Sequence, residues 1–402
     1  MKLVKFEFKK IWKQKKILWL MLIVFLSTTY LYSHNVSQQD DMAHRLYEAT
    51  EPLLFQVNQK DKELDEKKIN HQLDEIGSEQ STYIKNMKNA LFQWRSAIHA
   101  EEFHDVPNFE QEFLENLKEY INTGGEFQVL DGIDLEYAFI KNQWMIKHDL
   151  AIENEENPIS PHLFLKDVSD WLFGISGIVL LLLIFGNILS SEREQETWRT
   201  LKTQPISQSQ MILSKFSVLL FVLFFYIIIV LAIGVLLPIL FNDHPFEFIY
   251  PQMMLSEDEV FAISTLHYIL FKILLFVGTG FISFSLLFLF STLFKQTFNS
   301  LIVSLFTLLI GYYTTHLVSA IQTPLNLFQH LRFNQTIIEI NQSHGWTYPL
   351  FASLWTLIFL TTTLLIPERK TKPIKTESNI KPFNSGDTNS KRGILLNVII
   401  FV

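Results

Sequence analysis

The stretch "SVLLFVLFFYIIIVLAIGVLLPILF" (217–241) has no charged residue and is long enough to cross the hydrocarbon core of a bilayer, which takes about 20 helical residues. A second such stretch, "WLFGISGIVLLLLIFGNIL" (171–189), lies shortly before it. Long apolar runs with few charges recur along the chain. They predict six membrane spans, at 17–33, 171–190, 215–241, 266–291, 299–318 and 349–366.

These runs predict helices, because a backbone in lipid must satisfy its own hydrogen bonds and a continuous apolar segment of this length does so as a helix. The strands of an outer-membrane barrel would be half as long, with alternating polarity. The sequence therefore predicts an all-α polytopic membrane protein. The 402 residues include no cysteine, so no disulfide supports any domain.

The positions of lysine and arginine predict the orientation of the spans, since cytoplasmic flanks are enriched in both. Seven lysines precede the first span in "MKLVKFEFKKIWKQKK" (1–16). If that end is cytoplasmic, alternation also places 191–214, 292–298 and the tail 367–402 inside, and each of these segments carries basic residues. The prediction is amino-in, carboxyl-in.

The segments predicted to lie outside are acidic. Residues 34–170 contain 28 acidic against 12 basic residues, and 242–265 contains acidic residues and no basic one. Apolar residues three and four apart predict a mostly helical extracellular domain at 34–170. The outside segment 319–348 is long for a turn and is expected to hold one or two short helices.

Residues 1–16 have the pattern of an amphipathic helix in the inner-leaflet interface, with its lysines among anionic headgroups. A plain basic flank that sets topology is the alternative. No small-residue cleavage site follows the first apolar run, so an uncleaved anchor is favoured over a secretory signal. The residues that mark the interfacial helix are Lys5, Phe8, Lys9, Ile11 and Trp12.

Motifs that carry catalytic or ligand chemistry are absent from the sequence. There is no P-loop, zinc-protease, paired-cysteine, nucleophile-elbow or dinucleotide-binding motif, so we predict no catalytic, cofactor-binding or metal site and no nucleic-acid partner. His99 and His104 are five residues apart, which favours a solvated surface over a metal site. Within the fourth span, Lys272 is expected to snorkel outward.

The loop "SSEREQETWRTLKTQPISQSQMILSKF" (190–216) is more elaborate than a tight link between two spans requires. Its first part is expected to continue the second span as a helix, which Pro205 ends. Ser207 and Gln210 have the spacing of a capping box that starts the third helix. We therefore predict a built cytoplasmic feature between two stiff helices.

This loop resembles the segment between the second and third spans of ABC-2-type transporter permeases. That family shows an acidic start, a threonine, a leucine, a "P-[IVL]-S" and a lysine leading into the next span. The six spans and the amino-terminal helix agree with it, and the long insert resembles a large-ectodomain branch. The usual glycine beside the threonine is Trp198 here. The corresponding residues are Glu192, Glu194, Glu196, Thr197, Leu201, Pro205, Ile206, Ser207 and Lys215.

The resemblance implies the permease subunit of an ATP-driven exporter in the plasma membrane. ATP would bind a separate ABC ATPase, and a second permease copy, identical or paralogous, would complete the unit. The implied ATPase-coupling residues are Glu192, Glu194, Glu196, Thr197, Trp198, Arg199, Leu201, Pro205 and Ser207.

An amphipathic or hydrophobic substrate is expected for so phenylalanine-rich a membrane domain. The alternative is a non-transporting anchor or sensor whose extracellular domain binds a partner, with a secondary transporter as a third reading.

Overall fold

The described part of the chain is 79% helical, and its longest helices are apolar. The computed structural model describes residues 2–39, 42–71, 74–194, 207–241, 246–256, 259–294, 296–318, 322–342 and 346–366. The predicted tail at 367–402 lies outside these residues.

Six segments have the length and composition to cross a membrane, which confirms an all-α polytopic membrane protein. One of them, Ile175–Glu192, is built from two short helices. The other five are α2 (Lys16–Ser37), α12 (Gln208–Phe241), α13 (Thr265–Leu293), α14 (Thr297–Leu317) and α16 (Thr347–Leu365).

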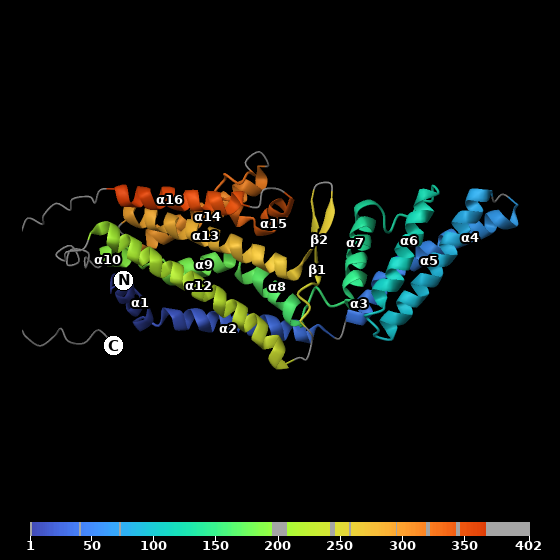
Figure 1. Ribbon diagram of the computed structural model, residues 1–402, viewed down its shortest axis with the longest axis horizontal. Coiled ribbons are helices and arrows are strands. Elements are labelled where there is room, and N and C mark those ends of the chain that lie inside the picture. The colour runs from blue at the N-terminus through green and yellow to red at the C-terminus, as the bar shows by residue number, and fades with distance from the viewer. Residues whose placement is uncertain are drawn as a thin grey trace, which may run out of the picture. The chain divides into compact units, whose positions relative to one another are not determined.

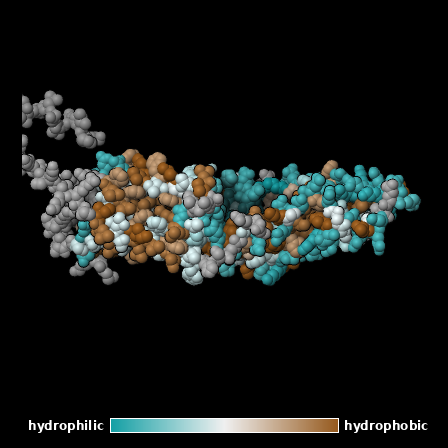
Figure 2. Space-filling view, turned by 90° about the horizontal axis from the view of Figure 1, so that it is seen from above, coloured by the Kyte–Doolittle hydropathy of each residue, from teal (hydrophilic) through white to brown (hydrophobic). Residues whose placement is uncertain are grey.

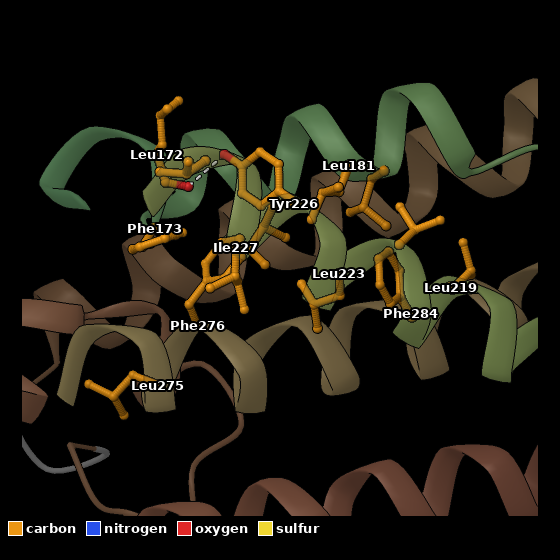
Figure 3. Close-up of a cluster of buried hydrophobic side chains, with 14 of the residues drawn as sticks. Leu172, Phe173, Leu181, Leu219, Leu223, Tyr226, Ile227, Leu275, Phe276 and Phe284 are labelled. Atoms are coloured by element: carbon orange, nitrogen blue, oxygen red, sulfur yellow. Dashed lines mark hydrogen bonds between the residues drawn. The ribbon is translucent and has the colours of Figure 1, made fainter. Parts of the chain in front are cut away.

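The second, third and fourth spans form the centre of the membrane part. α12 and α13 lie along each other and along α8 (Pro161–Leu172) and α9 (Ile175–Phe185) (Figure 1). Their fully buried side chains include Leu181, Leu223, Tyr226 and Phe276 (Figure 3). The first, fifth and sixth spans are mostly exposed, so they are the surfaces that this chain leaves to lipid or to another chain.

The residues between the first two spans fold into a helical domain, here called the insert domain. It has its own core, in which Val57, Ile84, Met87 and Phe113 are fully buried. Figure 2 shows hydrophilic residues over much of this domain and hydrophobic ones over the spans. Its helices are α3 (Met42–Ala49), α4 (Glu51–Ile69), α5 (Glu75–His99), α6 (Val106–Asn122) and α7 (Gly132–His148).

Local sequence explains where these helices begin and end. Pro52 and Pro107 lie in the first turns of α4 and α6, where a missing N–H costs nothing. The Asp74 side chain accepts the Gly77 N–H at 2.8 Å and caps α5. After α6, Gly124 adopts a φ of +83°, which ends the helix.

Short elements fill the connections between the later spans. Strands β1 (Pro251–Leu255) and β2 (Val260–Ser264) pair antiparallel, with Met253 opposite Ala262. This hairpin lies in the loop 242–265, where no strand was predicted. A 3₁₀ turn, η3 (Gln329–Leu331), and α15 (Phe333–Gln342) lie in 319–348 and confirm the short helices expected there.

The second span is divided by a break before α9 and another after it. The turn at 186–189 separates α9 from α10 (Ser190–Glu194), and Phe173–Gly174 separates it from α8. At the first break the Tyr226 hydroxyl of α12 donates to the Leu172 carbonyl at 2.9 Å (Figure 3). A carbonyl without a partner is costly in lipid, so this bond stabilises the break.

Gly177 is required for that break. A Cβ at this position would lie 1.9 Å from the Leu172 oxygen and 2.9 Å from the Tyr226 hydroxyl. We expect Gly177→Ala to destabilise the chain by about 1–3 kcal/mol, the usual cost of overpacking. Thermal unfolding in detergent measures this.

Gly278→Ala is the matched control, since a Cβ there would meet only the Ala352 Cβ, at 3.2 Å. Equal loss of thermal stability in the two variants would show that the contact with Leu172 has no special importance.

Candidate functional site

Four charged side chains from three elements meet at one end of the spans, and we call them the α1 charge cluster: Glu7, Lys10, Glu192 and Lys215. The Lys215 Nζ lies 2.8 Å from Glu192 Oε1 and 3.0 Å from Glu7 Oε1. Lys10 Nζ lies 2.7 Å from the same Glu192 oxygen. The cluster joins α1 (Lys2–Lys13), α10 and the start of α12.

Three of the four side chains in this cluster are nearly fully buried, and the Lys10 side chain is 36% exposed. The Lys215 side chain has no exposed surface, and those of Glu7 and Glu192 are each 6% exposed. Lys215 Nζ also lies 3.4 Å from the Ile188 carbonyl, in the turn between α9 and α10. Two ammonium groups balance two carboxylates, which makes the burial of Glu7, Glu192 and Lys215 tolerable.

Helix α1 reaches the cluster because one of its faces packs on α12. Ile11 is 2% exposed and belongs to the membrane core, one turn from Glu7. Lys15 adopts a φ of 56° between α1 and α2, which allows the chain to turn from one helix into the other. Lys16 at the start of α2 donates to Asn187 Oδ1, so the first span is tied to the same region.

The predicted residues of the interfacial helix divide between two faces. Ile11 is buried, whereas Phe8 and Trp12 are 41% and 57% exposed. Lys5 and Lys9 are exposed beside them. An aromatic and basic surface therefore faces away from the bundle. That this face meets the inner leaflet stays a prediction.

The predicted coupling residues that the structure describes lie in three settings. Glu192 is in the buried cluster. Glu194 is exposed and its Oε2 accepts the Thr297 N–H at 3.4 Å. Ser207 and Gln210 bond reciprocally, each side chain to the other's N–H at 3.3 Å, so the predicted capping box is confirmed. Outside the described residues lie Glu196, Thr197, Trp198, Arg199, Leu201 and Pro205.

Sequence reasoning missed Glu7 and Lys10 as members of a site, and read Lys215 only as part of a family pattern. A signal for Glu7 was present, since it is the single acid among the seven lysines of 1–16. An acid that interrupts a basic helix, together with a lysine inside an apolar run, indicates a buried ion pair.

A second charged group lies at the other end of the second span, and we call it the Asp170 cluster: Asp170, Tyr268, Lys272 and Asn334. Lys272 Nζ lies 2.8 Å from Asp170 Oδ1 and 2.8 Å from Asn334 Oδ1. The Lys272 side chain is only 3% exposed. The expectation that it snorkels outward is wrong, because the Asp170 carboxylate provides a buried partner.

The segment 149–160, here called the connector, joins the insert domain to α8. The connector's Glu155 lies 2.7 Å from Lys141 Nζ of α7 and accepts the Tyr250 hydroxyl at 2.9 Å. Asn35 of α2 donates to the Pro158 carbonyl at 2.9 Å. The connector therefore contacts the insert domain, the first span and the segment before β1.

Glu153 in the connector lies in a poorly solvated, acidic setting. Its Oε2 accepts the Ser160 hydroxyl and is 3.5 Å from Nε2 of the fully buried His162, whose Nδ1 accepts the Glu247 N–H. Burial raises the pKa of Glu153 to about 7. The charges of Glu247 and Glu155 act in the same direction, and the Ser160 bond opposes them.

Among the described residues, no group of three or more histidine, cysteine, aspartate or glutamate side chains is arranged to hold a metal ion. The two clusters found here are ion pairs between span ends. Their chemistry is suited to holding helices in register.

The geometry defines a polytopic membrane protein whose span ends are joined by buried charges. A family model described as ABC-2 family transporter protein matches residues 1–370, and the chain belongs to this family. It is therefore a permease component of an ABC transporter, a membrane subunit of a kind that is not itself catalytic. No significant match was found among curated proteins or among solved structures.

Lys215 is expected to hold the α1 charge cluster together. Lys215→Met leaves two carboxylates buried without this ammonium, and we expect a loss of about 3–5 kcal/mol in the free energy of unfolding. Thermal unfolding in detergent checks this, with Lys13→Met on the exposed side of α1 as the control. The triple variant Glu7→Gln, Glu192→Gln, Lys215→Met should regain most of the loss. Wild-type stability in the single variant would contradict the assignment.

The raised pKa of Glu153 predicts that stability depends on pH. The folded chain keeps this proton up to about pH 7, whereas a carboxyl with the ordinary pKa of 4.5 has lost it. Because the folded state holds more protons in this window, its stability falls as the pH rises. We expect Glu153→Gln to gain thermal stability relative to the wild type as the pH rises from 4.5 to about 7. Glu101→Gln, at an exposed position, is the control. A Glu153→Gln difference that is independent of pH would refute the assignment.

Proposed function

We propose that this chain is the permease subunit of an ATP-driven exporter that moves an amphipathic or hydrophobic substrate out of the cell across the plasma membrane. A separate ABC ATPase supplies the energy, and a second permease copy completes the pathway. The family membership supports a transport role, and the sequence has no P-loop of its own. The spans that remain exposed in the single chain are consistent with a second copy.

The observation that carries the proposal is the α1 charge cluster. The predicted ATPase-coupling segment runs from Glu192 to Ser207, and its first residue is a member of the cluster. α10, in which this segment begins, the start of α12 after it, and α1 are joined by salt bridges of 2.7–3.0 Å. A force applied to α1 or to the segment therefore reaches the second and third spans together.

Burial makes this connection stiff. Exposed salt bridges are weak and screened by salt, whereas the side chains of Glu7, Glu192 and Lys215 are shielded from solvent. Separating Lys215 from its carboxylates would leave charges without partners in an apolar surrounding. We therefore propose that α1, α10 and the first turns of α12 move as one body when the ATPase closes.

Purification of the tagged chain from its native membrane in mild detergent tests the proposal. We expect an ABC ATPase to co-purify in equimolar amount, identified by mass spectrometry. The variant Glu196→Lys with Arg199→Glu should lose the ATPase while membrane insertion is unchanged, because both charges lie in the predicted docking segment.

A matched control makes the same two kinds of charge change at exposed positions of the insert domain, Glu112→Lys with Lys85→Glu. This variant should retain the ATPase. Recovery of the wild-type chain without any ATPase, and with a secreted or cell-wall protein bound, would instead support the anchor or sensor.

A further inference from the structure

The second span and the helix that leads into it form three helical segments in series, α8, α9 and α10, with a charged residue in each outer segment. Asp170 lies in α8 and Glu192 in α10, 22 positions apart in the sequence. A continuous helix of this length would extend about 33 Å, close to the thickness of the hydrocarbon core at about 30 Å, and the turns at 173–174 and 186–189 interrupt this one. The Asp170 cluster and the α1 charge cluster therefore lie toward opposite ends of this series of helices.

The Asp170 cluster joins three elements that are far apart in the sequence. Asp170 belongs to α8, Lys272 to α13 and Asn334 to α15. Tyr268, one turn before Lys272, donates its hydroxyl to Asp170. The rings of Tyr268 and Phe333 lie 5.5 and 5.6 Å from the Lys272 ammonium. The cluster is thus a junction between the second span, the fourth span and the segment between the fifth and sixth.

Net stability does not explain this arrangement well. Lys272 is seven residues from the first residue of α13, about 10 Å along the helix, and is almost fully buried. A buried ion pair is often no more stable than apolar residues of the same size. Charged residues inside spans are costly and commonly serve a function. What the ion pair between Lys272 and Asp170 provides is a fixed position, because it holds α8 at one place along α13.

Helix α8 also receives the connector from the insert domain. Along the chain, a displacement of α9 and α10 reaches α8 through the break at Phe173–Gly174. At this break the Tyr226 hydroxyl holds the Leu172 carbonyl from the α12 side. The Lys272 ammonium holds Asp170 from the α13 side. α8 is therefore fixed on two spans immediately before the break.

We infer that Lys272 is a positioning residue for transport: through Asp170 it holds α8 against α13 and α15, so that movement generated at α10 is delivered to the connector and the insert domain. The inference rests on the proposed function, because the movement originates in an ATPase bound near α1. It gives the insert domain a role in transport, in which this domain receives the movement that begins at α10.

Hydrogen exchange of the permease–ATPase complex in lipid nanodiscs tests this inference, with and without a non-hydrolysable ATP analogue and Mg²⁺. In the wild type, nucleotide should change exchange in α1 and α10 and also in 149–172. Lys272→Met should remove the nucleotide-dependent change in 149–172 and leave that in α1 and α10. Lys272→Arg, which keeps the charge, should behave as the wild type.

Lys166→Met is a matched control. Lys166 Nζ contacts the other oxygen of the same carboxylate at 3.1 Å from within α8 and lies 6.0 Å from the Tyr268 ring of α13, so its loss removes one positive charge and leaves the bridge from Lys272 to Asp170 in place. It should retain the nucleotide-dependent change. If Lys272→Met fails to fold, the isosteric Asp170→Asn serves in its place, because Asn334 still accepts from Lys272.

The outcomes separate the two proposals. If Lys272→Met and Asp170→Asn keep the wild-type response in 149–172, or if Lys166→Met loses it too, the inference is wrong and the proposed function stands. If the wild type binds no ATPase, or shows no nucleotide response in α1 and α10, the proposed function fails and this inference fails with it.

Discussion

The ammonium group of Lys215 is the constraint on which the membrane part depends. Lys215 lies at the start of the third span without exposed surface, and two carboxylates from two other elements neutralise it. A buried charge fixes its partners more narrowly than apolar packing does, because a small displacement of an apolar side chain costs little and the separation of buried ions costs much. The amino-terminal helix is therefore an integral part of the bundle, although its sequence reads as a surface element.

The fold was predictable because its determinant is local. A long, mostly apolar segment must be helical in lipid whatever surrounds it, so the six spans follow from the chain alone. The capping box of Ser207 and Gln210 was predictable for the same reason, since its partners are three residues apart. The hairpin of β1 and β2 was missed, because a two-stranded ladder depends on cross-strand pairing and packing that short runs of sequence specify weakly.

The site was only partly predictable, because its contacts are not local. Glu7 and Lys215 are far apart in the sequence, as are Asp170 and Lys272, and only packing brings them together. The family pattern marked Glu192 and Lys215 separately without indicating that they bond. For Lys272, the length of the side chain suggested a route to the surface, but the deciding fact was a carboxylate on another helix. The length of the Lys272 side chain alone therefore does not predict which group it bonds to.

The breaks in the second span have a mechanical consequence. An unbroken helix has a length set by its rise per residue, whereas this span has an eleven-residue helix, α9, between two turns. Its two charged ends are bonded to neighbouring spans, so they cannot slide to follow the headgroups when the bilayer becomes thicker or thinner. The span must therefore adjust to a change in bilayer thickness by bending at the turns 173–174 and 186–189. The span therefore has a rigid helix, α9, with a flexible turn at each end. A change in the lipid composition that alters the membrane thickness acts on these two turns.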